Sequence, residues 1–214
     1  MRKNLFMLMA TALLSLFIST SPAQAAAIQN KDFTVLGVPI ETDSGSKIEV
    51  DEFFWYGCPH CFNLEPGLNS WIKTVPKDVA IHRIPAVLNN SWAVQAKVWY
   101  ALSALGLANK YHDDFFNAIH LDGLDARSEV SIFNWAGKMG INQQAFANAY
   151  NSFGVQSQVA HAAQLTKEAQ ITGVPTFVVD GQYVTSESMT GGEAALFQTL
   201  DALIAKARRA HARH

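Results

Sequence analysis

The sequence predicts an α/β fold in which a block of helices interrupts a sheet, and three observations support this. Residues 48–56 are rich in β-branched and aromatic side chains and end at Gly57, which is typical of a strand buried within a sheet. From Asn89 onward, apolar residues recur at helical spacing. A strand pattern returns only at residues 176–185. We therefore expect one sheet domain that carries a helical insertion.

The elements can be placed in order along the chain. A strand at 48–56 leads into a helix at 58–73, which contains Pro66 and is expected to bend there, and a second strand follows at 78–85. The inserted helices are expected from Asn89 through Leu105 and at about 111–120, 128–139 and 143–152, and a long helix at about 155–169 leads back to the sheet. Strands at 176–180 and 183–185 form a hairpin, and a last helix spans 193 to about 209. The expected parts are 1–25 (a leader), 26–88, 89–153 (the insertion) and 154–214.

The first 25 residues have the three parts of a secretory signal peptide. Arg2 and Lys3 precede an apolar run from Leu5 to about Ile18, and the small residues up to Ala25 suit a signal peptidase. A run of about 14 residues is shorter than the roughly 20 that span a hydrocarbon core. We expect cleavage after Ala25 and a soluble exported chain, with an uncleaved membrane anchor as the alternative.

Charge argues against one class of partner. The whole chain carries a net charge of −2 at pH 7, and loss of the leader makes it more negative, so nothing in its charge favours nucleic-acid binding. Basic residues cluster only in the tail at 206–214, where they are expected to complement the dipole of the last helix.

Cys58 and Cys61 are the only cysteines, and they have the spacing C-x-x-C. Export would place them in an oxidising compartment. A structural bridge across so short a loop would contribute roughly 2 kcal/mol on the chain-entropy model, which a core of this size does not need. A zinc site would need two further ligands, and no second C-x-x-C or pair of histidines lies near the motif. A redox-active pair without a metal is the leading interpretation, and the other two remain open.

The flanking residues assign roles to the pair. Pro59 suits the first position of a helix, which places Cys58 at the N-cap. There the unpaired N–H groups and the helix dipole stabilise a thiolate. We expect Cys58 to be exposed and to react first, and Cys61, deeper in the first turn, to resolve the mixed disulfide. His60 is expected to add positive charge or a hydrogen bond to the sulfur of Cys58.

The dipeptide Pro59-His60, the segment 52–54 (Glu-Phe-Phe) and the segment 173–176 (Gly-Val-Pro-Thr) resemble the DsbA family of periplasmic disulfide oxidases. The resemblance covers about residues 33–203. It implies a thioredoxin fold with an inserted α-helical domain. It also implies a periplasmic, monomeric enzyme without a cofactor, which donates its Cys58–Cys61 disulfide to reduced exported proteins and is reoxidised by a quinone-linked membrane protein of the DsbB type.

The resemblance also implies further site residues. The Val174–Pro175 bond would be cis, and its backbone would pair with an extended substrate strand; an ordinary trans proline is the alternative. Glu52 would lie buried beneath Cys61 and handle the proton of that thiol, unless it merely marks the solvated start of its strand.

Two features near this site concern the mechanism and the direction of thiol-disulfide exchange. Glu65 and Arg83 could form an ion pair close to Glu52. A stabilised Cys58 thiolate favours the reduced form, so the disulfide becomes an oxidant.

Two other functions compete with that of an oxidase. A reductase or isomerase uses the same chemistry in the other direction. Isomerases of the DsbC type carry an N-terminal dimerisation domain, for which the about 20 residues between the leader and Ile48 leave no room, and they tend to have threonine where this chain has Val174. A peptide-binding, chaperone-like module with an inert disulfide is the alternative from another class.

Overall fold

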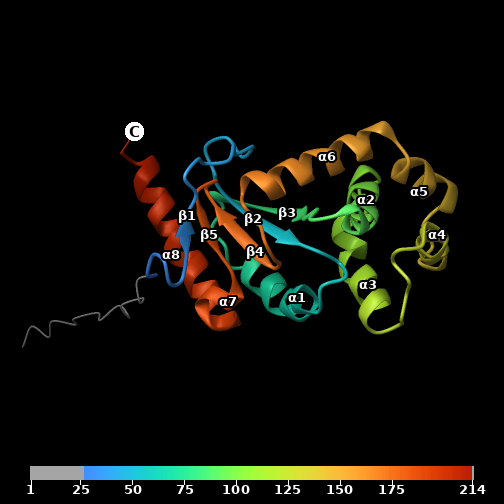
Figure 1. Cartoon of the computed structure of the whole chain (residues 1–214), viewed down its shortest axis with the longest axis horizontal. Helices are drawn as coiled ribbons and strands as arrows, with labels where there is room; N and C mark the ends of the chain where they lie inside the picture. The colour runs from blue at the N-terminus through green and yellow to red at the C-terminus, as the bar shows by residue number, and fades with distance from the viewer. Residues whose placement is uncertain (1–26, 214) are drawn as a thin grey trace, which may run out of the picture.

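Five strands form one sheet, in the order β1-β5-β4-β2-β3, in the computed structural model, which describes residues 27–213 (Figure 1). Their bounds are Thr34–Val35 (β1), Ile48–Phe54 (β2), Val79–Pro85 (β3), Thr176–Val179 (β4) and Tyr183–Thr185 (β5). β2 pairs in parallel with β3, and the other pairings are antiparallel. The four predicted strands therefore form. β1 was not predicted, because two residues are too short to leave a pattern. The expected signal peptide lies outside the described residues.

The helices follow the predicted order. Their bounds are Pro59–Ile72 (α1), Asn90–Ala104 (α2), Ala108–His120 (α3), Glu129–Lys138 (α4), Gln143–Tyr150 (α5), Phe153–Glu168 (α6), Glu187–Thr190 (α7) and Glu193–His211 (α8). Five of them begin after a residue whose side-chain oxygen accepts a first-turn N–H, namely Asn89, Ser128, Asn142, Ser152 and Ser186. The single turn α7 was not predicted. Among the described helices, none combines the length and apolarity of a membrane span.

The side chains of β2 alternate between two layers of helices. Val50 faces the layer of α1 and α8, where it packs in a cluster with Leu64 and Leu200. Phe53 faces the other side, where Ala162 of α6 closes a second cluster. All seven residues of β2 are buried, as expected for a central strand with helices on both faces.

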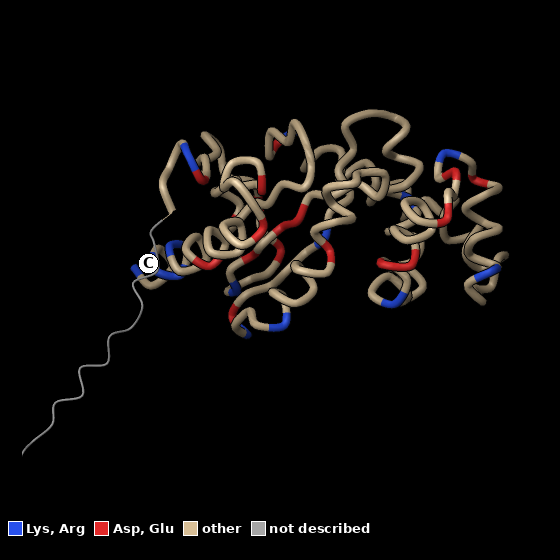
Figure 2. Tube along the Cα trace, turned by 90° about the horizontal axis from the view of Figure 1, so that it is seen from below, with Lys and Arg blue, Asp and Glu red and all other residues tan. Residues whose placement is uncertain are grey.

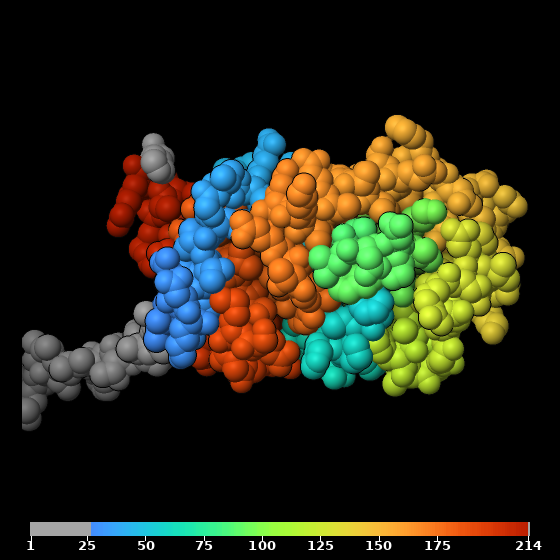
Figure 3. Space-filling model, in the orientation of Figure 1, coloured from blue at the N-terminus to red at the C-terminus, as the bar shows by residue number. Residues whose placement is uncertain are grey.

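The inserted helices α2 to α5 lie together beyond the end of β2, and α6 runs back from them to the sheet (Figure 1). The space-filling view shows the insertion and the sheet part in continuous contact, with α6 crossing from one to the other (Figure 3). A cluster of aromatic residues fills the insertion and reaches Phe54 and both cysteines. The fold is thus a thioredoxin-like α/β sheet with an inserted helical domain, as predicted.

The basic tail lies at the end of α8, as expected, with Arg208, Arg209 and His211 in its last turn. Arg208 also forms a bidentate ion pair with Asp78, with N–O distances of 2.7 and 3.0 Å, which the sequence does not reveal. Lys and Arg elsewhere are scattered along the whole molecule without a continuous stripe in the view of Figure 2.

Candidate active site

The C-x-x-C pair occupies the first turn of α1. Cys58 is the N-cap residue, with extended backbone angles (φ −89°, ψ 116°), and Pro59 holds the first helical position. The backbone N–H of Cys61 donates to Sγ of Cys58 over 3.4 Å. This is the predicted arrangement, and both cysteines are free thiols. The sulfur of Cys58 therefore faces the positive end of the helix.

The expectation that Cys58 is exposed is wrong. Only 7% of its surface is accessible, and Cys61 is fully buried. The sulfur of Cys58 is covered because it lies against the loop before β4, 3.4 Å from the carbonyl oxygen of Val174, to which the protonated thiol donates. Pro59 and His60 are exposed beside it. Cys58 remains the more accessible of the two sulfurs, so the predicted order of their reactivity is still sterically possible.

The two thiols have opposite acidities. The pKa of Cys58 is lowered from 9.0 to about 6, first by a hydrogen bond from the Cys61 thiol and then by the backbone N–H groups of Cys61 and His60 and the charge of His60, against the effect of burial. The pKa of Cys61 is raised by its burial and then by the neighbouring Cys58 sulfur. Near neutral pH the pair therefore holds one thiolate, on Cys58, and one thiol, on Cys61.

The loop before β4 forms the second wall of the site. The Val174–Pro175 peptide bond is cis, so the alternative of a trans proline is wrong. Beside it lies an open groove of about 660 Å³. It is lined by His60, by residues 170–176 and by residues 186–189 among others. The groove thus begins at the cysteine motif and runs along the loop.

Buried polar groups extend beneath the cysteines. Glu52 is 1% exposed, so the alternative that it marks a solvated start of the strand is wrong. Arg83 donates from Nε to Glu52 over 3.1 Å and from a terminal nitrogen to Glu65 over 3.0 Å, which confirms the expected pair of Glu65 and Arg83. His112 of α3 contacts Glu65 over 3.1 Å through Nε2 and the Tyr56 hydroxyl over 2.9 Å through Nδ1. These five side chains connect the sheet to the insertion.

The acidities in this network are shifted toward neutral forms. Burial raises the pKa of Glu52 to about 7, the charge of Glu65 adds to the shift, and Arg83 opposes it. Burial likewise raises the pKa of Glu65 to about 7, again against Arg83. Burial and Arg83 lower the pKa of His112 to about 3, which keeps its ring neutral. Glu52 can therefore gain or lose a proton near pH 7.

Sequence reasoning missed some of these residues. The contact between Glu52 and Arg83 could have been found, because the parallel register of β2 and β3 places them directly opposite each other. No sequence pattern points to His112, which lies 47 residues from Glu65 and reaches it only through the packing of α3 against α1.

Comparisons with known proteins agree with this geometry. A family model described as a DSBA-like thioredoxin domain matches residues 77–203. The thiol:disulfide interchange protein DsbA of Burkholderia cepacia is 37% identical over 201 residues, which cover 92% of this chain and 95% of the relative. The DsbA of Pseudomonas aeruginosa strain PAO1 is 33% identical over 97% of this chain and 98% of the relative.

Solved structures extend the agreement to three dimensions. The crystal structure of Pseudomonas aeruginosa DsbA superposes with a TM-score of 0.82 at 33% identity, over 86% of this chain and 95% of that chain. Reduced DsbA1 from Neisseria meningitidis gives a TM-score of 0.78 at 26% identity, over 89% and 100% of the two chains. Sequence, fold and motif thus lead to one assignment: this chain belongs to the DsbA family and is a thiol-disulfide oxidoreductase.

Proposed function

We propose that the enzyme works as a periplasmic oxidase, in which a Cys58–Cys61 disulfide is donated to reduced, newly exported proteins. The opposite acidities of the two cysteines carry this proposal. A thiolate stabilised on Cys58 stabilises the reduced enzyme relative to the disulfide, and this raises the reduction potential. For a two-electron couple, about 1.4 kcal/mol of such stabilisation corresponds to roughly 30 mV.

The donation has two balanced steps. A substrate thiolate attacks Sγ of Cys58, the bond between Cys58 and Cys61 breaks, and its electron pair goes to Cys61, which takes up a proton because its pKa is raised. A second substrate thiolate then attacks the substrate sulfur of the mixed disulfide and releases Cys58 as a thiolate. The low pKa of Cys58 makes it a good leaving group. The substrate loses two electrons and the enzyme gains them.

Glu52 is the group we assign to the proton of Cys61. Its pKa of about 7 lets the carboxyl act as acid or base near neutral pH, and its charge raises the pKa of Cys61, which supports their proximity. Glu52 would supply a proton when Cys61 leaves, and accept it when Cys61 attacks during reoxidation. Arg83 would hold the carboxyl in place.

The groove along residues 170–176 is the proposed binding site for the substrate. An extended peptide there could pair with the backbone at Val174 and Pro175, main chain to main chain, while its cysteine meets Cys58. Backbone pairing is independent of substrate sequence, which suits an enzyme that acts on many unfolded chains.

We include the remaining predictions from the sequence in this proposal. They are export through cleavage of the leader after Ala25, a monomeric state, no nucleic-acid partner, reoxidation by a quinone-linked protein of the DsbB type, and the domain boundaries at 26–88, 89–153 and 154–214. The motif residues and the family support them.

Equilibration with glutathione tests the proposed direction. We expect a reduction potential near the about −120 mV that is characteristic of the DsbA family, rather than the about −270 mV of thioredoxin. A value near that of thioredoxin would favour a reductase. A disulfide that resists mild dithiols would instead favour a peptide-binding module with an inert bridge.

Replacing His60 by serine is expected to raise the pKa of Cys58 and to lower the reduction potential together. The charge of His60 is the smallest of the effects that lower this pKa, and the backbone N–H persists in the variant. The change should therefore lie near 20 mV, the lower end of the roughly 20 to 60 mV that one nearby charge produces. Thiolate absorbance against pH gives the pKa, and glutathione equilibration gives the potential. If both match the parent, His60 is a bystander.

Replacing Glu52 by glutamine is expected to slow the attack of Cys61 on a Cys58–glutathione mixed disulfide by roughly 100-fold, at the low end of general acid–base effects. The amide keeps the shape and a contact for Arg83 but cannot exchange the proton. Stopped-flow release of glutathione measures the rate. The matched control is Glu65→Gln, which removes a similarly buried partner of Arg83. Its loss should lower the pKa of Glu52 but leave a carboxyl that still exchanges protons, so the reaction should slow far less than in Glu52→Gln. If both variants are slowed equally, Glu52 has only a structural role and does not transfer the proton.

A further inference from the structure

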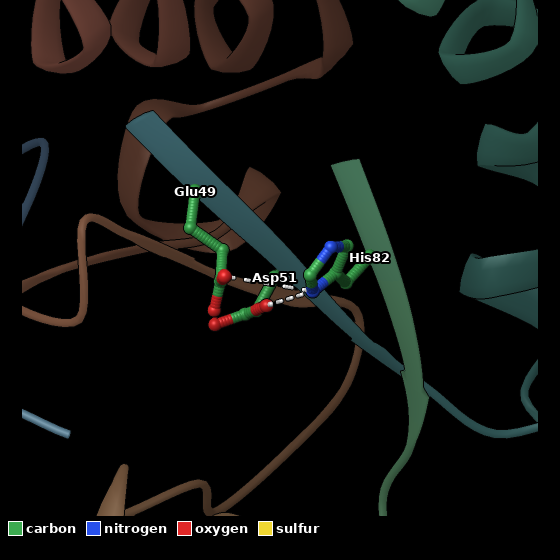
Figure 4. A group of neighbouring side chains, drawn as sticks. All are labelled: Glu49, Asp51 and His82. Carbon is green, nitrogen blue, oxygen red and sulfur yellow. Dashed lines mark ion pairs between the residues drawn. The ribbon is translucent and has the colours of Figure 1, made fainter. Parts of the chain in front are cut away.

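A second cluster of titratable side chains lies on the sheet face opposite to Glu52. Glu49 and Asp51 of β2 point to one face because strand residues alternate, and His82 of β3 stands directly across from Asp51 in the parallel register. Figure 4 shows the two carboxyl groups turned toward each other and toward the ring of His82. Glu49 lies near the start of β2 and Asp51 at its middle, whereas Cys58 follows its far end. The redox chemistry does not use this cluster.

Both carboxylates are buried, and one of them lacks a partner. Glu49 is 3% exposed and Asp51 is 2% exposed. Oδ1 of Asp51 accepts no hydrogen bond from any residue in the described range, although it points into the cluster. An unpaired buried charge is costly.

The hydrogen bonds around Ser44 fix the tautomer of His82. The Ser44 hydroxyl lies 2.6 Å from Oε2 of Glu49 and donates its one hydrogen there. It also lies 3.3 Å from Nε2 of His82, so at this contact it can only accept, and Nε2 must carry the hydrogen. A neutral His82 then directs the lone pair of Nδ1 at the carboxylates. Oε2 of Glu49 also accepts from the backbone N–H of Asp43 over 2.9 Å. Within the described part of the chain, Nδ1 of His82 and Oδ1 of Asp51 thus face each other without a hydrogen-bond donor from another residue.

The spacing of these groups suits a metal ion. Nδ1 of His82 lies 3.6 Å from Oε2 of Glu49 and 3.8 Å from Oδ1 of Asp51. Both distances are too long for hydrogen bonds. They are close to the about 3.4 Å that separates ligand atoms in a tetrahedral site with bonds of about 2.1 Å. One ligand atom from each of the three residues lies within 4.8 Å of the others.

We propose that Glu49, Asp51 and His82 form a binding site for one divalent transition-metal ion of the zinc type. An imidazole with two carboxylates suits such an ion, whereas Ca²⁺ prefers six to eight oxygens. The side chain of His82 is 41% exposed, which opens a path for the ion and leaves a position for water. Ser44 would act behind the ligands, by orienting both His82 and Glu49. The ion would tie β2 to β3 and to the segment before β2.

Zinc titration of the oxidised protein tests this proposal, because a closed Cys58–Cys61 disulfide cannot bind zinc through its sulfurs. We expect calorimetry to give one bound Zn²⁺ per chain, and the melting temperature to rise with Zn²⁺ but not with Ca²⁺. Asp51→Asn and His82→Ala should each weaken binding at least about tenfold. Asp51→Asn should also melt higher than the parent in the presence of a chelator, since it removes the unpaired carboxylate.

The matched control is His211→Ala. His211 is a similarly exposed histidine that contacts the buried carboxylate of Asp180 over 3.0 Å, but without a second acid. This variant should bind Zn²⁺ as the parent does. The proposal is overturned if Zn²⁺ fails to bind or stabilise the oxidised parent, or if Asp51→Asn and His82→Ala bind it as tightly as the parent. Stabilisation by Ca²⁺ rather than Zn²⁺ would overturn the assigned class of metal.

Discussion

Replacing Cys58 by serine is expected to abolish the oxidation of a reduced test protein, with activity falling to the uncatalysed background. A serine hydroxyl forms no disulfide, and Cys61 alone is fully buried and holds a thiol whose pKa is raised. The variant should keep its fold, because serine is a favourable N-cap residue and can accept the N–H of Cys61. Refolding of a reduced disulfide protein, followed by activity recovery, measures the effect.

Cys61→Ala separates the roles of the two cysteines. Its Cys58 thiolate can still attack a disulfide of an oxidised test protein, whose thiol then leaves. The resulting mixed disulfide should accumulate, because Cys61 is absent and cannot attack it. Mass spectrometry of the trapped complex identifies the linked residue. The opposite single variant, with only Cys61 present, should trap nothing. If Cys61 is found linked to a test protein, the assignment of roles is wrong.

The fold was predictable because its elements carry strong local patterns. Residues 48–54 form the buried strand β2, in keeping with their β-branched and aromatic side chains, although the predicted strand extended two residues further, and Asn89 caps α2 because its side chain accepts first-turn N–H groups. β1 escaped prediction because a two-residue strand exists only through its pairing with β5. The turn α7 is likewise too short for any periodicity.

The arrangement of the site could be predicted only for residues that are neighbours in the sequence. The N-cap place of Cys58 follows from Pro59 and the helix that comes after it, so the local electrostatics could be inferred. The burial of Cys58 could not, because the covering group is the carbonyl of Val174, 116 residues away. The same holds for His112 and for the pairing of Asp51 with His82, which depend on helix packing and on strand register. The chemistry of neighbouring residues can be inferred from the motif, whereas the burial of a side chain and its long-range contacts depend on the tertiary structure.

The acidity of Cys58 makes stability depend on the redox state and on pH. The folded pKa lies below the unfolded one, so the contribution to stability is fully present above the unfolded value and is lost as pH falls through the folded value. The shift from 9.0 to about 6 is worth about 4 kcal/mol when complete. At pH 7, one unit above the folded pKa, about 1.4 kcal/mol of it is present. Only the reduced protein has this contribution, because the disulfide has no proton to lose.

The free energy of unfolding of the reduced protein, minus that of the oxidised one, is therefore expected to increase with pH in a defined window. Denaturant unfolding of both forms between pH 5 and pH 9 measures it. The difference should increase by about 1.4 kcal/mol from pH 5 to pH 7 and by nearly 4 kcal/mol up to pH 9. Above pH 9 the raised pKa of Cys61 acts in the opposite direction, because the unfolded chain ionises there and the folded protein does not. The oxidised form is the internal control, since buried acids such as Glu52 titrate in both forms. A difference that stays flat between pH 5 and pH 9 would mean that the Cys58 thiolate is not stabilised, and one that falls as pH rises would contradict a disulfide donor.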